Sequence, residues 1–109
     1  MGKYRYIRKD RDNKKRECEA EQWFPDSENA DNLGVIKGSD LPKTHVAYRL
    51  ARERNLTDPT QWAFNPTPNY YSAGTIAVPG DWIVKFHLLT QRYVVPDRFF
   101  HELYELRED

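Results

Sequence analysis

The stretch that decides the fold covers residues 79–105 and reads PGDWIVKFHLLTQRYVVPDRFFHELYE. It opens with a turn, in which Pro79 presets the second position and Gly80 can adopt the positive φ that a type II turn needs at the third. Residues 82–88 and 92–95 are rich in β-branched and aromatic side chains and are separated by a short connection. This pattern predicts a β-hairpin that begins directly after the turn.

The hairpin is followed by a predicted helix and a last strand or tail. Pro96 ends the second strand, and Asp97 is placed to cap a short helix that begins at Arg98. Trp82 comes straight after the turn, in the most strand-like run of the chain, and is therefore expected in the core. The other large aromatic side chains expected in the core are Trp23, Phe86 and Phe99.

A second pair of strands is predicted near the N-terminus. Residues 4–7 form the first strand, a turn rich in Asp and Asn follows, and residues 15–24 pair back as the second. Glu17, Glu19 and Glu21 fall on one face of the second strand. Basic residues opposite these carboxylates are expected to form cross-strand ion pairs.

Residues 44–55 can be interpreted in two ways. A helix capped by Thr44 would bring four apolar residues to one side, whereas a strand would run through residues 44–50. We favour the helix. Proline-rich segments interrupt regular structure after it. A short strand is predicted at residues 61–64, and residues 75–78 lead into the turn at Pro79.

Together these elements predict a single α+β domain over residues 1–109. We expect a small antiparallel β-sheet or a partly open barrel with one or two short helices. Because aliphatic residues are sparse, the core must be built largely from the aromatic side chains, which make up 14% of the chain.

Charge and cysteine content limit the classes of function. The 17 basic residues are balanced by 17 acidic ones, so no overall field attracts nucleic acid. The single cysteine, Cys18, excludes an intramolecular disulfide and fits a reducing cytosol. No apolar run is long enough for a membrane span, and none follows the basic start as a secretory signal would.

Both ends of the chain resemble a family of small phage and prophage proteins. The C-terminal half of that family reads roughly PGDWIIKGVKGEFYPCKPDIFEATYE, and residues 79–85, 96–99 and 104–105 are similar to it. Its N-terminal signature reads roughly KYRKKPVVVEAVQW, and residues 3–5 and 19–23 are similar to that. The family's glycine-rich hairpin and its Tyr-Pro-Cys-Lys-Pro segment are replaced here. Most members have no assigned activity, so the resemblance implies a phage source and not a mechanism.

The residues favour a protein without catalytic activity. Cys18 lies in a predicted strand with no adjacent base and is interpreted as a small buried apolar residue. His45, His87 and His101 are isolated, and none stands near another His or Cys at the spacing of metal ligands. The chain also has no phosphate-binding glycine loop and no nucleophile elbow. We therefore expect no catalytic residue, no cofactor and no metal.

Two segments are candidate binding sites. The first is rich in arginine, aromatic residues and prolines and is least similar to the phage family. Its polar surroundings suggest that the aromatic side chains lie at the surface and bind a partner, and the alternative is that they are buried over a sheet. Its candidate residues are Arg49, Arg52, Trp62, Tyr70 and Tyr71, with Phe64 in the same surface segment. The second is a basic run whose binding to an acidic partner or to nucleic acid would depend strongly on salt. It consists of Lys14, Lys15 and Arg16.

These features predict a phage-encoded, non-catalytic binding protein that acts on a host protein in the host cytoplasm. The expected role is inhibition of a host antiviral defence protein. One alternative is a module that sequesters a nucleotide by aromatic stacking and arginine contacts. Another is a structural or assembly role in the virion. Nucleic acid is a less expected partner than protein, and no membrane partner is expected.

Overall fold

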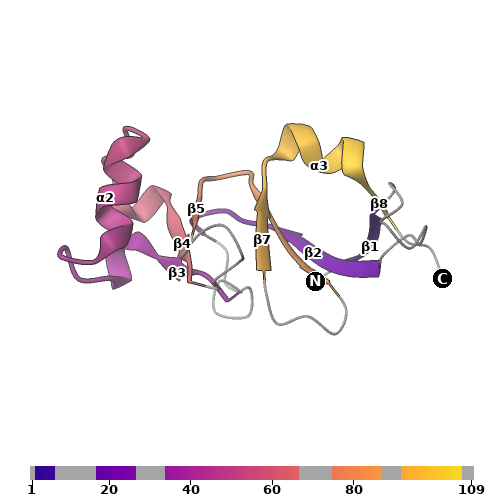
Figure 1. Ribbon diagram of the computed structural model, residues 1–109, viewed down its shortest axis with the longest axis horizontal. Helices are drawn as coiled ribbons and strands as arrows, with labels where there is room; N and C mark the ends of the chain where they lie inside the picture. The colour runs from indigo at the N-terminus through magenta and orange to yellow at the C-terminus, as the bar shows by residue number, and fades with distance from the viewer. Residues whose placement is uncertain (1, 7–16, 27–33, 67–74, 87–91, 107–109) are drawn as a thin grey trace.

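The computed structural model describes residues 2–6, 17–26, 34–66, 75–86 and 92–106. Within these ranges the chain forms eight strands and two α-helices, and the strands belong to two antiparallel sheets (Figure 1). This confirms the predicted α+β class, and the described strands form open sheets and no closed barrel. Neither helix in the described ranges has the length and apolar character needed to cross a membrane.

The larger sheet has five strands: β1 (Gly2–Tyr6), β2 (Glu17–Gln22), β6 (Trp82–Phe86), β7 (Arg92–Val95) and β8 (Tyr104–Leu106). Their order is β7-β6-β2-β1-β8, and each neighbouring pair is antiparallel. The pairs β1–β2 and β6–β7 are the two that the sequence predicts, and pairing of β2 with β6 joins them. The two ends of the chain therefore build one sheet.

One face of the larger sheet carries opposite charges on neighbouring strands. Glu19 lies opposite Lys3, and Glu17 lies opposite Arg5. Arg5 also approaches the next strand, where its Nη1 lies 4.0 Å from Oε1 of Glu105. The register thus places basic residues opposite Glu17 and Glu19 as predicted, whereas Glu21 lies opposite Ile83 of β6. Exposed pairs of this kind each stabilise a fold by roughly 0.2–1 kcal/mol.

The other face of the larger sheet is covered by helix α3 (Asp97–Leu103). Side chains from β2 and β6 pack there against Phe100 and Tyr104. Phe100 is 1% exposed, whereas Phe99 is 43% exposed, so the prediction that Phe99 belongs to the core is wrong. Neighbouring residues of a helix point about 100° apart, and only one of the two rings can face the sheet.

The start of α3 also differs from the sequence prediction. Pro96 occupies the N-cap position, Asp97 is the first helical residue, and no side chain caps this end. The prediction of Asp97 as the N-cap is therefore wrong. Trp82 packs against the buried cluster beneath α3 but is itself only half-buried, so its predicted place in the core is confirmed in part. The side chain of Phe86 lies outside the described part of the structure.

The smaller sheet has three strands in the order β3 (Ile36–Lys37), β4 (Ala63–Asn65) and β5 (Thr75–Ala77). Between the two sheets lies a cluster centred on Trp23, which is fully buried and confirms the prediction for this residue. β4 begins later than the predicted strand at residues 61–64, because Pro59–Gln61 form a 3-10 turn, η2.

Helix α2 spans Val46–Glu53, which confirms the helix over the strand for this segment. Its N-cap differs from the predicted Thr44. His45 takes that position, and its Nδ1 accepts a hydrogen bond of 3.0 Å from the backbone N–H of Ala47. The imidazole thus supplies the acceptor that a Ser, Thr or Asp side chain usually provides.

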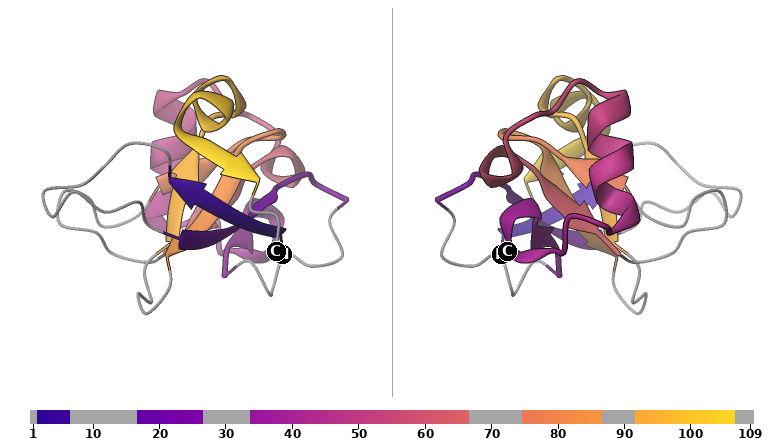
Figure 2. Two further views of the ribbon diagram at one scale, coloured as in Figure 1. Left: turned by 90° about the vertical axis from the view of Figure 1, so that its right-hand side faces the viewer. Right: turned by 90° about the vertical axis from the view of Figure 1, so that its left-hand side faces the viewer.

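α2 packs on the side of the smaller sheet that faces away from the larger one (Figures 1 and 2). Ala47 and Ala51 of the helix contact Trp62 and Phe64 of the sheet side. Trp62 is 1% exposed and Phe64 is 5% exposed, so the surface interpretation is wrong for both and the alternative, burial over a sheet, is confirmed. The helix covers both rings, which the local proline- and asparagine-rich sequence does not reveal.

The predicted turn before β6 is present. Gly80 has a φ of +95°, and the backbone N–H of Asp81 donates to the carbonyl of Val78 at 3.0 Å. The Asp81 carboxylate closes the same turn by accepting from the N–H of Val78 at 3.0 Å. The turn is anchored to the end of β2, since Trp23 exchanges backbone hydrogen bonds with Gly80 and Asp81.

Candidate functional site

An open cleft of about 310 Å³ lies along the solvent side of α2. Its lining includes three basic side chains, one apolar side chain and two ring-bearing side chains. They are Lys43, Arg49, Arg52, Val46, His45 and Tyr48.

The register of α2 explains why these residues share one side. Ala47 and Ala51 are spaced four apart and face the core, where both are almost completely buried. Val46, Arg49 and Arg52 follow one another at intervals of three on the opposite face, and all three are exposed. The packing that holds the helix therefore points these three side chains into solvent.

The two ring-bearing residues of the cleft are fixed by the fold. Tyr48 donates its hydroxyl to the carbonyl of Gly38 at 2.8 Å, and its ring meets the Trp62 ring edge-on at 5.2 Å. His45 caps the helix through Nδ1, and its ring lies edge-on to Phe64 at 5.0 Å. Both rings form the wall of the cleft and are already engaged in intramolecular contacts.

The arginines of the cleft differ from the other arginines of the described ranges. Arg5 pairs with a carboxylate, Arg54 donates to a backbone carbonyl of β5 at 2.9 Å, and Arg98 lies over an aromatic ring. Arg92 also has an interaction partner. Arg49 and Arg52 form no side-chain hydrogen bond or ion pair with any described residue. Among the described residues that line the cleft there is no carboxylate. The described lining is therefore positively charged, and the acidic residue of α2 is Glu53, four residues after Arg49.

The predicted binding residues fall into three groups: two lie in the cleft, one is buried, and five lie outside the described ranges. Arg49 and Arg52 lie together in the cleft, as their spacing on a helix requires. Trp62 lies beneath the cleft in the core and is not available to a partner. The remaining predicted residues lie outside the described ranges, and their roles stay predictions. They are Tyr70, Tyr71, Lys14, Lys15 and Arg16.

Sequence analysis missed Lys43 and Val46 as members of this site. Lys43 precedes α2 in an irregular segment, so its place depends on how the chain enters the helix. Val46 looks like a core residue in an apolar count, yet it is 45% exposed. The signal that could have found it is the helix register, because Ala47 and Ala51 leave Val46 on the other side.

No protein-family model, curated protein or solved structure matches the chain. The resemblance to phage accessory proteins therefore stays a prediction.

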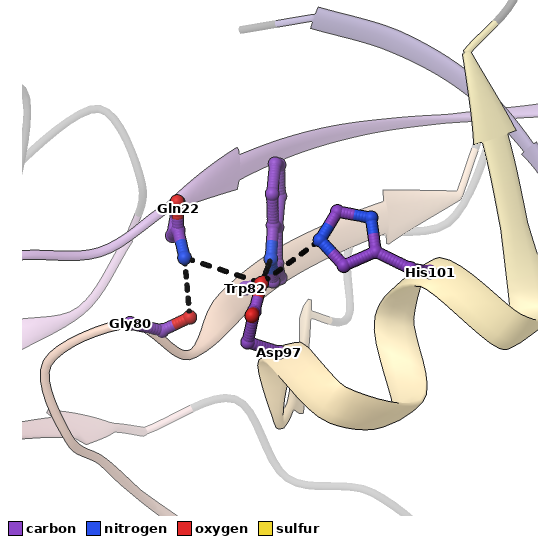
Figure 3. Close-up of polar contacts among 5 residues, drawn as sticks. All are labelled: Gln22, Gly80, Trp82, Asp97 and His101. Atoms are coloured by element: carbon purple, nitrogen blue, oxygen red, sulfur yellow. Dashed lines mark hydrogen bonds and ion pairs between the residues drawn. The ribbon is translucent and has the colours of Figure 1, made fainter.

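A second polar cluster, centred on Asp97, joins α3 to the larger sheet (Figure 3). Asp97 Oδ1 accepts from Trp82 Nε1 at 2.8 Å and from Gln22 Nε2 at 3.3 Å, and it lies 3.0 Å from His101 Nε2. Gln22 Nε2 also donates to the Gly80 carbonyl at 2.9 Å. One carboxylate thus ties the first turn of α3 to β2 and β6.

The Asp97 cluster has the geometry of a structural link. No described side chain that could act as a nucleophile is hydrogen-bonded to His101. Cys18 is buried, and burial raises the pKa of its thiol to about 11, so it is protonated at neutral pH. The described residues contain no group of three or more His, Cys, Asp or Glu that could hold a metal ion.

Asp97 is expected to make stability depend on acid pH. The hydrogen bond from Trp82 and the nearby His101 lower the pKa of Asp97 below its usual range. A depressed carboxyl pKa stabilises the fold above the unfolded-state value of about 3.9, and this stabilisation is lost as the pH falls through the folded-state value. Melting temperatures measured from neutral to strongly acid pH should therefore fall more steeply in the wild type than in Asp97→Asn.

Asp40→Asn is the matched control for this pH series. Asp40 is exposed, and its side chain forms no hydrogen bond with a described residue. Its acid profile should follow the wild type. Parallel profiles for the wild type and Asp97→Asn would show that the cluster does not contribute to acid sensitivity.

Proposed function

We propose that this chain is a non-catalytic binding protein and that a partner protein docks on the cleft along α2. The observation that carries the proposal is the pair Arg49 and Arg52, which project from α2 into one open cleft and form no ion pair with a described residue. Arginine is enriched among the residues that dominate binding energy at protein interfaces. An arginine without an internal partner can bind a carboxylate without first breaking another contact.

The helix that carries these arginines is well held. Ala47 and Ala51 are buried against Trp62, Phe64 and Ile76. The C-terminal end of α2 is tied to β5, because Arg54 Nη1 donates to the Ile76 carbonyl at 2.9 Å. A preorganised helix loses little conformational entropy on binding, which favours a docking role.

The geometry supports a protein partner over a sequestered nucleotide. A small-molecule site usually buries most of its ligand, whereas this cleft lies open along the helix. The rings that line it, His45 and Tyr48, are engaged in edge-on contacts with Phe64 and Trp62. Stacking on Tyr70 or Tyr71, which lie outside the described ranges, stays a prediction.

The resemblance to phage accessory proteins supports a host protein as the partner. The first target that we propose to test is a host defence protein. We expect this protein to inhibit it stoichiometrically by binding, without modifying or cleaving it. Turnover of many target molecules by one molecule of this protein would contradict a non-catalytic role.

Replacing both cleft arginines by alanine is expected to abolish most partner binding while leaving the fold intact. The partner is captured from host lysate by the immobilised protein, purified and then titrated calorimetrically. Arg49→Ala/Arg52→Ala should weaken binding by about tenfold to a hundredfold, since interface arginines often contribute more than ~1 kcal/mol each. Circular dichroism should show an unchanged fold, because both side chains are exposed.

Arg98→Ala is the matched control for the double arginine variant. It removes an exposed arginine from α3, far along the chain from α2, and should bind like the wild type. A variant of Lys14, Lys15 and Arg16 tests the second predicted site. If the partner binds the α2 variant normally and loses affinity for the Lys14–Arg16 variant, the proposed docking site is wrong.

A further inference from the structure

Resting on the proposed function, we infer that the segment docked on α2 is an acidic peptide segment of the partner with an apolar side chain between its carboxylates. Three observations carry this inference: the charge of the cleft, an exposed valine inside it, and the engagement of its rings. Each one limits the chemistry of the occupant.

The charge of the cleft calls for an anionic occupant. Arg49 and Arg52 are three residues apart on α2, so their stems lie about 5–6 Å apart on one face. Lys43 adds a third cation at the start of the cleft, and the described part of the lining holds no carboxylate. The acidic residue of α2, Glu53, is four residues after Arg49 but lies outside the described lining and forms no ion pair with Arg49. Carboxylates of a partner can therefore bind both guanidinium groups, and a guanidinium can bind a carboxylate in bidentate fashion.

An exposed valine adds an apolar contact to the cleft. Val46 is 45% exposed and lies one helical turn before Arg49, on the same side of α2. A strongly hydrated anion such as free phosphate gains nothing from a valine methyl surface. A peptide with a leucine or a similar side chain between its acidic residues buries Val46 while its carboxylates contact the arginines.

The rings of the cleft argue against a base-stacking ligand. Tyr48 is held by its hydroxyl to Gly38 and edge-on to Trp62, and His45 is held by its capping bond. A nucleotide or a single-stranded nucleic acid would gain affinity from a free aromatic face. The balanced formal charge of the chain, 17 basic against 17 acidic residues, also provides no broad field for a polyanion. The occupant favoured by these contacts is a short acidic and apolar peptide.

Synthetic peptides test the chemistry directly with the full-length protein. The first probe is a short capped peptide of glutamates around a central pair of leucines. The second has serines in place of the leucines, and the third has glutamines in place of the glutamates. Fluorescence anisotropy should rank the first peptide tightest, with at least about tenfold weaker binding of each of the others.

Variants assign each part of the peptide to a part of the cleft. Arg49→Ala and Arg52→Ala should each weaken the binding of both acidic peptides by about threefold or more. Val46→Ser should weaken only the binding of the leucine-containing acidic peptide and leave the affinity for the serine peptide unchanged. Arg98→Ala, the control on α3, should change neither. Equal binding of the glutamine peptide, or equal loss of both acidic peptides in Val46→Ser, would overturn the inference.

Competing anions complete the test. Inorganic phosphate, ATP and a single-stranded oligonucleotide are titrated under the same conditions, and each should bind more weakly than the first peptide. Tighter binding of any of them overturns the peptide inference. If no acidic peptide binds while the captured partner still depends on Arg49 and Arg52, the inference about the segment is wrong and the proposed docking function stands. If the captured partner binds the Arg49→Ala/Arg52→Ala variant as tightly as the wild type, the docking function is wrong as well.

Discussion

Replacing Phe100 by alanine is expected to lower the free energy of unfolding by about 3–5 kcal/mol. The ring is 1% exposed and stacks on Trp82, with centroids 3.9 Å apart and planes within 4°. Its other neighbours are Tyr104, stacked at 4.9 Å, and Tyr4, edge-on at 5.0 Å. Removal leaves a cavity among three rings that the sheet and α3 hold in place. Because small domains are stable by only about 5–15 kcal/mol, most of the stability could be lost.

The adjacent residue provides a matched control. Phe99→Ala removes the same side chain from the next position of α3, where the ring is 43% exposed, and should change the free energy by less than about 1 kcal/mol. Urea titrations monitored by circular dichroism measure both variants. If Phe100→Ala is too unstable to measure, Phe100→Leu keeps most of the volume and should lie between the wild type and the alanine variant. Similar losses for Phe99→Ala and Phe100→Ala would contradict the assignment of Phe100 to the core.

The contrast between these two residues shows where local sequence stops being informative. The turn at Gly80, the pairing of β6 with β7 and the helix after Pro96 follow from signals that act over a few residues. The choice of which phenylalanine faces the sheet depends on where α3 begins. An error of one residue in that start rotates the helix by about 100°, which is enough to exchange Phe99 for Phe100.

Burial in the middle of the chain is harder to predict from the sequence, because the residues that cover Trp62 and Phe64 are distant from them along the chain. Trp62 and Phe64 lie among proline, asparagine and threonine residues, a composition typical of exposed loops. They are buried because β4 pairs with β3 and β5 and because α2 covers that sheet. Burial produced by long-range pairing leaves no trace in the composition of the segment itself.

Part of the candidate site is predictable from the sequence, and part depends on the fold. Arg49 and Arg52 were found from the chemistry of arginine, which does not depend on the fold. Assigning Val46 to the cleft needs the phase of α2, which is set by the burial of Ala47 and Ala51. The Asp97 cluster combines side chains from β2, β6 and α3, so only the assembled sheet brings it together.

Gly38→Ala is expected to destabilise the fold by about 3 kcal/mol, at the upper end of the cost of overpacking a core. Gly38 is buried at the start of the 3-10 turn η1 (Gly38–Asp40), against the face of Trp62. An added Cβ would lie 2.7 Å from Cε2, Cζ2 and Cη2 of that ring, far inside normal van der Waals contact. Neither the Gly38 backbone nor Trp62 can shift easily to relieve this contact. The Gly38 N–H donates to the Trp62 carbonyl at 2.9 Å, and its carbonyl accepts from Tyr48 at 2.8 Å.

A double-mutant cycle with Trp62 identifies the clash as the cause. Trp62→Phe removes part of the large ring system that the new methyl would meet, so Gly38→Ala should cost at least about 1 kcal/mol less in that background than in the wild type. Ser39→Ala, at an exposed position of the same turn, should change the free energy by less than about 0.5 kcal/mol. An equal cost of Gly38→Ala in both backgrounds would show that backbone freedom, and not contact with Trp62, requires glycine at this position.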